Sequence, residues 1–270
     1  ERGFDLGATR EYFDGLQLVY SGHILGSQGL LIDGEVYYTG DFAARPRAFL
    51  DGGRAVKCST LIIESTYGRE TYRFPPLAKV LEQANRLISD LFSKGIPVVL
   101  MGYPLGKAQI LSDLFSSWDP IYVHGSVWRM NQAYVKLGID LRTDLQPYSQ
   151  ASEKGLLKRR PWILISPIES GRSAFIRSLK KNYGVVTVAF TGWSMDPSYK
   201  YALAVDHALP LSDHCDFDEL VDLVRRCSPK KVYTLHGYAA EFASHLRRLG
   251  FDAEPLLEIQ KSMRDYFKGD

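Results

Sequence analysis

Four short polar segments each place a side chain that can bind a metal at the end of an apolar run. The four residues are His23 in SGHILGS, Asp41 in YTGDF, His214 in SDH and His236 in LHG. Imidazole and carboxylate ligands held at strand ends around one cleft are what a hydrolytic metal site requires. Glycines next to His23, Asp41 and His236 would let a metal or substrate approach the backbone closely. We therefore expect a metal-dependent hydrolytic centre.

A purely structural role is the simpler interpretation of each residue taken alone. His23 would then be a hydrogen-bonded loop histidine, and Asp41 a helix cap or turn residue. The same setting, an apolar run that ends beside glycine, occurs independently at His23, Asp41 and His236. Three such coincidences favour metal binding over three unrelated structural roles.

Two further residues could move a proton. Glu64 ends an apolar run and could cap a following helix, and His214 is flanked by acids that could cap it. A carboxylate beside a histidine raises the pKa of the imidazole and keeps it protonated near neutrality. Such a histidine is a competent general acid for a leaving alkoxide. The nearby Asp216, Asp218 and Glu219 are expected to open the next helix, where acids favour the dipole.

The segment Gly102–Gln109 follows a predicted strand and precedes a predicted helix, like a phosphate-binding loop. A Walker A motif needs four residues between its glycines and Ser or Thr after the lysine. Here there are three residues, and Ala108 follows Lys107, so nucleotide hydrolysis is excluded. Gly106 and Lys107 are instead expected to contact a substrate phosphate at the helix N-terminus.

Basic and aromatic clusters give a weaker indication of a nucleic-acid partner. The basic residues are Lys154, Lys158, Arg159 and Arg160, followed by Arg172, Arg177, Lys180 and Lys181. They fit a solvated face as well as the border of a nucleic-acid channel. The turn from Tyr67 to Phe74 could stack bases, with Tyr67 in contact with substrate, or could pack into the core.

Composition sets broad limits. The chain has 270 residues with 33 basic and 31 acidic side chains, so its net charge of +2 does not point to a polyanionic partner. Three cysteines without CxxC spacing argue against a disulfide framework and favour a reducing cytoplasm. No apolar run reaches the roughly 18 to 20 residues that span a bilayer, so we expect no membrane partner.

The elements that must position these residues follow two patterns. Short strands are expected at 16–20, 28–32, 35–39 and 60–63, with a hairpin turn at Asp33-Gly34. A long amphipathic helix follows Pro75-Pro76 and stops near Gly95. Strands and helices then alternate, as in a parallel sheet covered by helices. Strands at 208–211 and 231–235 each end at a histidine motif. We expect a domain over residues 73–192 inserted between 1–72 and 193–270, which together form the first domain.

The segments SGHILGS, YTGDF, ESTYG, SDH and LHG occur in the order of five motifs of a known family. The chain resembles the metallo-β-lactamase superfamily, in its nuclease branch with an inserted β-CASP domain. YRFPP, LGKAQ and SDH are most similar to ligase-associated DNA exonucleases and archaeal proteins related to messenger-RNA 3′-end processing factors. The resemblance implies an α/β fold: an αββα sandwich, lacking its N-terminal part, with an inserted parallel-sheet β-CASP domain.

The resemblance also implies a reaction. The protein would be a zinc-dependent nuclease of the 3′-end-processing or exonuclease type, with two zinc ions. His23 would bind one zinc, His236 the other, and Asp41 would bridge both. A water that bridges the metals would attack phosphorus in line. Glu64 would orient His214, which would protonate the leaving oxygen. The implied partners are RNA or DNA and a DNA ligase or RNA-processing proteins, and a homodimer is left open.

The sequence departs from the family at one motif. An HxHxDH segment, which supplies ligands to both metals, should precede His23, yet no histidine does. The remaining ligands cannot close two tetrahedral sites, so this chain is expected to bind zinc weakly or not at all. Either an N-terminal part is missing from the sequence or the protein is a metal-poor relative. The alternative function is therefore a non-catalytic, nucleic-acid-binding subunit of the same fold.

Overall fold

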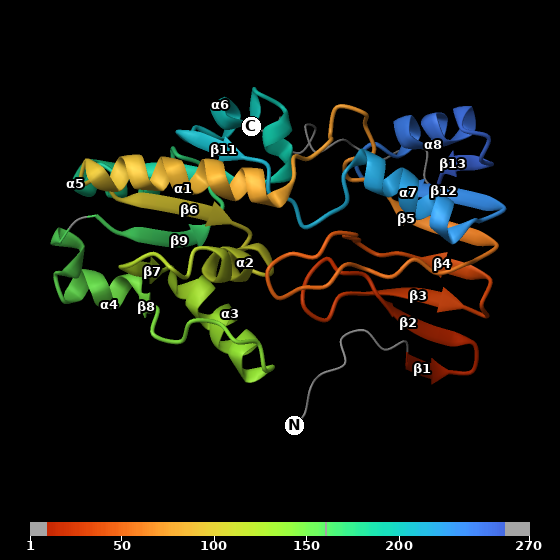
Figure 1. Ribbon diagram of the computed structural model, residues 1–270, viewed down its shortest axis with the longest axis horizontal. Coiled ribbons are helices and arrows are strands. Elements are labelled where there is room, and N and C mark those ends of the chain that lie inside the picture. The colour runs from red at the N-terminus through yellow and green to blue at the C-terminus, as the bar shows by residue number, and fades with distance from the viewer. Residues whose placement is uncertain (1–9, 160, 257–270) are drawn as a thin grey trace. The chain divides into compact units, whose positions relative to one another are not determined.

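The computed structural model describes residues 10–159 and 161–256, which form two units (Figure 1). Unit 1 comprises Arg47–Phe49 and Phe74–Ser212. Unit 2 comprises residues 10–46, Leu50–Arg73 and 213–256. Arg160 of the first basic cluster, and the ends of the predicted domains at 1–9 and 257–270, lie outside the described residues.

Unit 2 contains a seven-stranded sheet with the order β1-β2-β3-β4-β5-β12-β13. Its strands are β1 (Arg10–Phe13), β2 (Leu16–Tyr20), β3 (Gln28–Ile32), β4 (Val36–Tyr38), β5 (Thr60–Glu64), β12 (Lys231–Leu235) and β13 (Ala253–Pro255). The first four pair antiparallel, whereas β4, β5, β12 and β13 run parallel. Asp33 and Gly34 have φ angles of 52° and 68°. Positive φ at both positions is what a two-residue hairpin turn needs, so the predicted hairpin is confirmed.

Two helices, α7 (Phe217–Cys227) and α8 (Ala239–Arg248), bury their apolar sides against this sheet. The core combines residues of both helices with residues of β2, β3, β4, β5 and β12. Asp216 caps α7: its carboxylate accepts the N–H of Glu219 at 2.9 Å, and Glu219 accepts the N–H of Asp216. The predicted opening of this helix by acidic residues is confirmed. The two hydrogen bonds fix the direction of the chain just after His214.

Unit 1 contains a fully parallel six-stranded sheet with the order β11-β10-β6-β9-β7-β8. Its strands are β6 (Val98–Gly102), β7 (Ile121–Val123), β8 (Gln146–Pro147), β9 (Ile163–Pro167), β10 (Val186–Phe190) and β11 (His207–Leu209). Its helices are α1 (Leu77–Ser93), α2 (Lys107–Leu114), α3 (Gly125–Lys136), α4 (Tyr148–Glu153), α5 (Ala174–Tyr183) and α6 (Tyr199–Leu203), with 3-10 turns at Leu156–Lys158 and Gly192–Met195. Every residue of β6 is buried, as expected for a parallel sheet covered on both faces.

The predicted α/β class, with a parallel sheet in the inserted domain (unit 1), is confirmed. The observed division of the chain lies further along than the predicted boundary at residue 192. Residues 193–212 group with unit 1 because β11 pairs in parallel with β10, with Val188 opposite His207. Among the described residues, no helix has the length and apolar character needed to cross a bilayer.

Candidate metal and proton-transfer site

The ends of neighbouring strands in unit 2 bring several predicted residues together. Asp41 follows β4, Glu64 ends β5, and β4 and β5 are parallel neighbours. His23 follows β2, and His214 immediately precedes the capped start of α7. The ligand atoms of His23, Asp41 and His214 all lie within 4.8 Å of one another. Three polar side chains separated by up to 191 positions therefore meet at one place.

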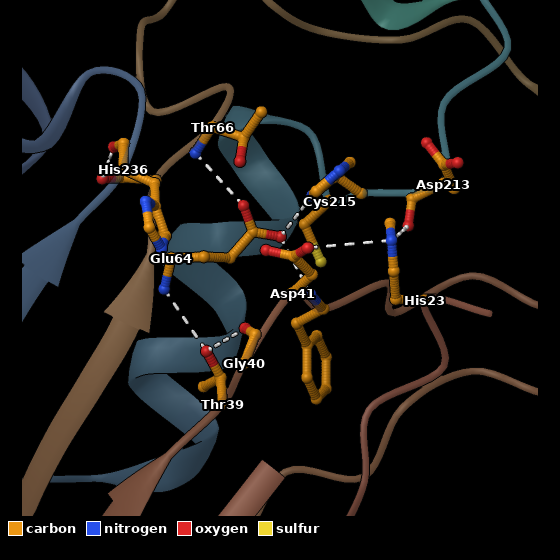
Figure 2. A network of polar contacts seen from close by, with 12 residues as sticks. His23, Thr39, Gly40, Asp41, Glu64, Thr66, Asp213, Cys215 and His236 are labelled. Atoms are coloured by element: carbon orange, nitrogen blue, oxygen red, sulfur yellow. Dashed lines mark hydrogen bonds and ion pairs between the residues drawn. The ribbon is translucent and has the colours of Figure 1, made fainter. Parts of the chain in front are cut away.

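Glu64 is the buried anchor of this site (Figure 2). It is 1% exposed, and its Oε1 accepts hydrogen bonds from Nδ1 of His214 and from the N–H of Phe42, both at 2.9 Å. Its Oε2 accepts the N–H of Thr66 at 3.1 Å. Burial alone would raise the pKa of Glu64, but His214 and these donors outweigh it and hold the pKa below its usual value. Glu64 is therefore an ionised carboxylate and does not cap a helix.

His214 is held as a cation by Glu64. Burial would lower the pKa of His214, yet the charge and hydrogen bond of Glu64 raise it to about 9, with help from Asp213 and Asp41. Because Nδ1 faces Glu64, a cation or a substrate would have to engage His214 through Nε2. His214 thus carries a transferable proton near neutral pH in the metal-free protein.

His23 has the opposite character. Its Nδ1 lies 2.8 Å from the backbone oxygen of Asp213, which accepts the Nδ1 proton and leaves the lone pair on Nε2. That Nε2 is 3.7 Å from Oδ2 of Asp41, and the two groups face each other in Figure 2. Burial, and then the positive charge of His214, lower the pKa of His23. His23 is therefore a neutral imidazole that can act as a ligand.

The donor atoms fit one zinc-class cation. Two imidazole nitrogens and one carboxylate oxygen form the three-ligand set typical of catalytic zinc, with the fourth position left open. Each histidine also gives its Nδ1 proton to an oxygen, which orients the ring for binding through Nε2. A cation would have to displace the Nε2 proton of His214, so binding would weaken as the pH falls.

The structure does not bring His236 into this cluster. His236 is exposed, has a φ of 62°, and its backbone oxygen accepts the Ser65 hydroxyl at 2.7 Å. In the view of Figure 2 it lies on the other side of Glu64 from His23. Gly237 follows with a φ of 55°, where a Cβ would come within 2.5 Å of the Ser65 oxygen. The glycine thus serves close backbone packing, and the metal role of His236 stays a prediction.

The three predicted substrate contacts lie in two places. In unit 2, Tyr67 is only 3% exposed, packs against Tyr72 and meets the His214 ring edge-on at 6.0 Å. In unit 1, Gly106 precedes α2 with a φ of 83°, and the buried Lys107 donates its amine to the Leu211 oxygen at 2.9 Å. Substrate binding by these residues stays a prediction, and in this structure all three have structural contacts.

Several groups that hold the site escaped prediction because they belong to the backbone. The Asp213 oxygen sets the tautomer of His23, and the Phe42 and Thr66 N–H groups stabilise the charge of Glu64. One further group is a side chain: the Thr39 hydroxyl accepts the N–H of Glu64 at 3.3 Å. Backbone groups occur at every position, so no residue type marks them. Only the neighbouring side-chain motifs indicate where to look.

Comparisons with known proteins show what the chain is similar to. Residues 202–254, which include His214 and His236, match the family described as the Zn-dependent metallo-hydrolase RNA specificity domain. A probable DNA ligase of Opitutus terrae is 38% identical over 88% of this chain and 23% of its own length. Two proteins of Methanocaldococcus jannaschii also match. An RNase J-like protein is 26% identical over 80% of this chain and 62% of its own. Transcription termination factor FttA is 28% identical over 91% of this chain and 49% of its own length.

A solved structure shares the fold. A protein of unknown function from Enterococcus faecalis superimposes with a TM-score of 0.57 at 16% identity, over 87% of this chain and 61% of its own. The chain spans between about a quarter and three fifths of the length of these relatives. With the motifs and the two sheets, these matches support the resemblance of the chain to the metallo-β-lactamase superfamily, in its β-CASP nuclease branch. The predicted resemblance is confirmed.

Proposed function

We propose that the protein containing this chain hydrolyses phosphodiester bonds of nucleic acid with the help of bound zinc. We further propose that His214, oriented by Glu64, protonates the leaving oxygen. The observation that carries the proposal is the pair of buried Glu64 and half-buried His214, placed beside His23 and Asp41. The nuclease relatives and the RNA-specificity match support a nucleic-acid substrate.

The chain's own groups would share the reaction as follows. A water oxygen attacks phosphorus as the bond from phosphorus to the leaving alkoxide breaks. The water gives up a proton to Asp41 or to solvent, and the alkoxide takes one from Nε2 of His214. Glu64 keeps its negative charge throughout and stabilises the imidazolium before the transfer. General acid catalysis of this kind contributes about 10²- to 10⁴-fold to a rate.

A bound cation would supply what these residues lack. Held by His23 and Asp41, it would stabilise charge on the phosphate and lower the pKa of the attacking water. His214 has two competing roles, because a proton and a cation would use the same Nε2. His236 lies outside this cluster and stays the predicted ligand of a second cation.

The experiment compares cleavage and metal content in the natural gene product. Labelled RNA and DNA oligonucleotides are incubated with the wild type and with His214→Ala, and zinc is measured by atomic absorption. The proposal expects the His214→Ala rate to fall by about 10²-fold or more, with zinc content near normal. His245→Ala is the matched control: it removes another histidine bonded to a glutamate in the same unit and should leave the rate unchanged.

The outcomes separate the alternatives. Equal loss of zinc and activity in His214→Ala would make His214 a ligand rather than the proton donor. A wild-type protein that holds no zinc and cleaves neither RNA nor DNA would overturn the enzyme proposal. Retained nucleic-acid binding in that case would favour the non-catalytic subunit.

A further inference from the structure

Cys58 and Cys227 of unit 2 meet although 169 positions separate them. Cys58 lies just before β5, and Cys227 is the last residue of α7. The N–H of Cys58 donates to the backbone oxygen of Cys227 at 3.3 Å, and the two thiols hydrogen-bond to each other. Disulfide-bonded residues have Cα atoms about 4.4–6.8 Å apart. Adjoining backbones and touching thiols place this pair within reach of a bond.

The surroundings hold both sulfurs in place. Cys227 is buried in the core of unit 2, and Cys58 packs against that core. The oxygen of Ser59 accepts the N–H groups of Lys230 and Lys231 at 2.8 and 3.0 Å, so the two chain segments stay together beyond the cysteines. Forming an S–S bond would therefore need little movement of the backbone.

The pair is also prepared for oxidation. The S–H of Cys58 donates to the sulfur of Cys227 and, with the Val56 N–H, lowers the pKa of Cys227 despite its burial. A thiolate is the nucleophilic form of cysteine. Cys58 is half-buried, so a small oxidant can approach the pair from its side. The third cysteine, Cys215, differs: burial raises the pKa of its thiol, and its sulfur accepts the N–H of Ala44 at 3.3 Å.

We propose that Cys58 and Cys227 are an oxidative modification site, which closes to an intramolecular disulfide on exposure to a peroxide. The thiolate of the pair attacks one peroxide oxygen, forming an S–O bond as the O–O bond breaks and one water leaves. The second thiol attacks that sulfur, an S–S bond forms, the S–O bond breaks and a second water leaves. Two thiols and one hydrogen peroxide thus give one disulfide and two waters. The sulfurs lose the two electrons that the peroxide gains.

The bond would join the start of β5 to the end of α7. These are the ends opposite to Glu64 and to the His214 segment, so the bond leaves the Glu64–His214 contact untouched. Closing so long a loop restricts the unfolded chain, and oxidation should raise the melting temperature by roughly 5 °C. Dithiothreitol should reverse the rise.

The test maps the bond in the 270-residue chain. Protein treated with hydrogen peroxide is alkylated under denaturing conditions, digested without reduction and analysed by mass spectrometry. We expect a cross-linked peptide containing Cys58 and Cys227, with Cys215 alkylated. Cys58→Ser and Cys227→Ser should abolish the cross-link and the melting shift, whereas Cys215→Ser should keep both.

Three other results would contradict the proposed modification site. They are a bond between Cys58 and Cys215, a disulfide between two copies of the chain, or alkylation of all three cysteines after peroxide treatment. The wild-type peptide map decides the question even if one of the serine variants fails to fold. No step depends on nuclease activity, so the outcome is independent of the proposed function.

Discussion

Unit 2 contains two histidine–glutamate pairs with the same bond length and different surroundings. His214 and His245 each place Nδ1 2.9 Å from Oε1 of a glutamate, Glu64 and Glu70 respectively. The Glu64 side chain is 1% exposed, whereas that of Glu70 is 54% exposed. Glu64 also accepts two backbone N–H groups, while Glu70 shares its oxygen with the exposed Arg248.

The difference shows that the distance between the partners does not determine what a pair can do. In water the charges of an exposed pair are screened, and the pair contributes about 0–1 kcal/mol. In the interior a charge needs its partner, because an unpaired buried charge is strongly destabilising. His214 is therefore a protonated group held at the cluster of ligand atoms, while His245 belongs to a surface network.

The largest expected difference between the pairs is in stability. Glu64→Ala leaves the half-buried His214 and two backbone N–H groups without their acceptor, and should lower the free energy of unfolding by about 3 kcal/mol. Glu70→Ala, the matched variant, should lower it by less than about 1 kcal/mol. Urea denaturation of the 270-residue chain measures both. Similar losses for the two variants would contradict the assigned role of burial.

The pH dependence should separate the wild type from His214→Gln. The pKa of His214 is about 9 in the folded chain and 6.5 in the reference state, so its protonation stabilises the fold. This contribution is fully present below pH 6.5 and is lost as the pH rises through about 9. Urea unfolding with a chelator, from about pH 6 to about pH 10, should show the stability gap between the two proteins narrowing. A constant gap would contradict the raised pKa.

Zinc affinity should distinguish His23, which lies in the ligand cluster, from His236, which lies outside it. The three donors should bind zinc weakly, because the described residues offer this cluster no fourth protein ligand and His214 must lose a proton. His23→Ala should weaken that affinity by about tenfold or more, whereas His236→Ala should change it by less than about twofold. Titration calorimetry of the chain at pH about 7.5 measures both. An equal effect of the two substitutions would place His236 among the ligands.

The smallest effect concerns the exposed pair itself. A double-mutant cycle with His245→Ala and Glu70→Ala should give a coupling free energy of about 0–1 kcal/mol, falling further at high salt. The same cycle on His214 and Glu64 should give a larger value that salt hardly changes. Equal couplings would remove the distinction between the two pairs.

Much of the fold followed from local patterns. The Asp33-Gly34 hairpin, the helix after Pro76 and the acidic start of α7 depend on residues close together in sequence, and all three are observed. The end of unit 1 did not follow, because it depends on the pairing of β11 with β10. Strand pairing joins segments that carry no mark of each other in the sequence.

The site divides in the same way. The sequence alone determined which side chains could bind a metal or move a proton, because residue type sets the available chemistry, and His23, Asp41 and Glu64 were all identified at strand ends. Only the tertiary structure decided that His214 joins His23 and Asp41 while His236 stays outside them. The contact between the buried Glu64 and His214, and the contact between Cys58 and Cys227, are likewise visible only in the tertiary structure. The packing of segments that are distant in sequence sets the distances between side chains and their burial. Distance and burial in turn determine the charge of each group.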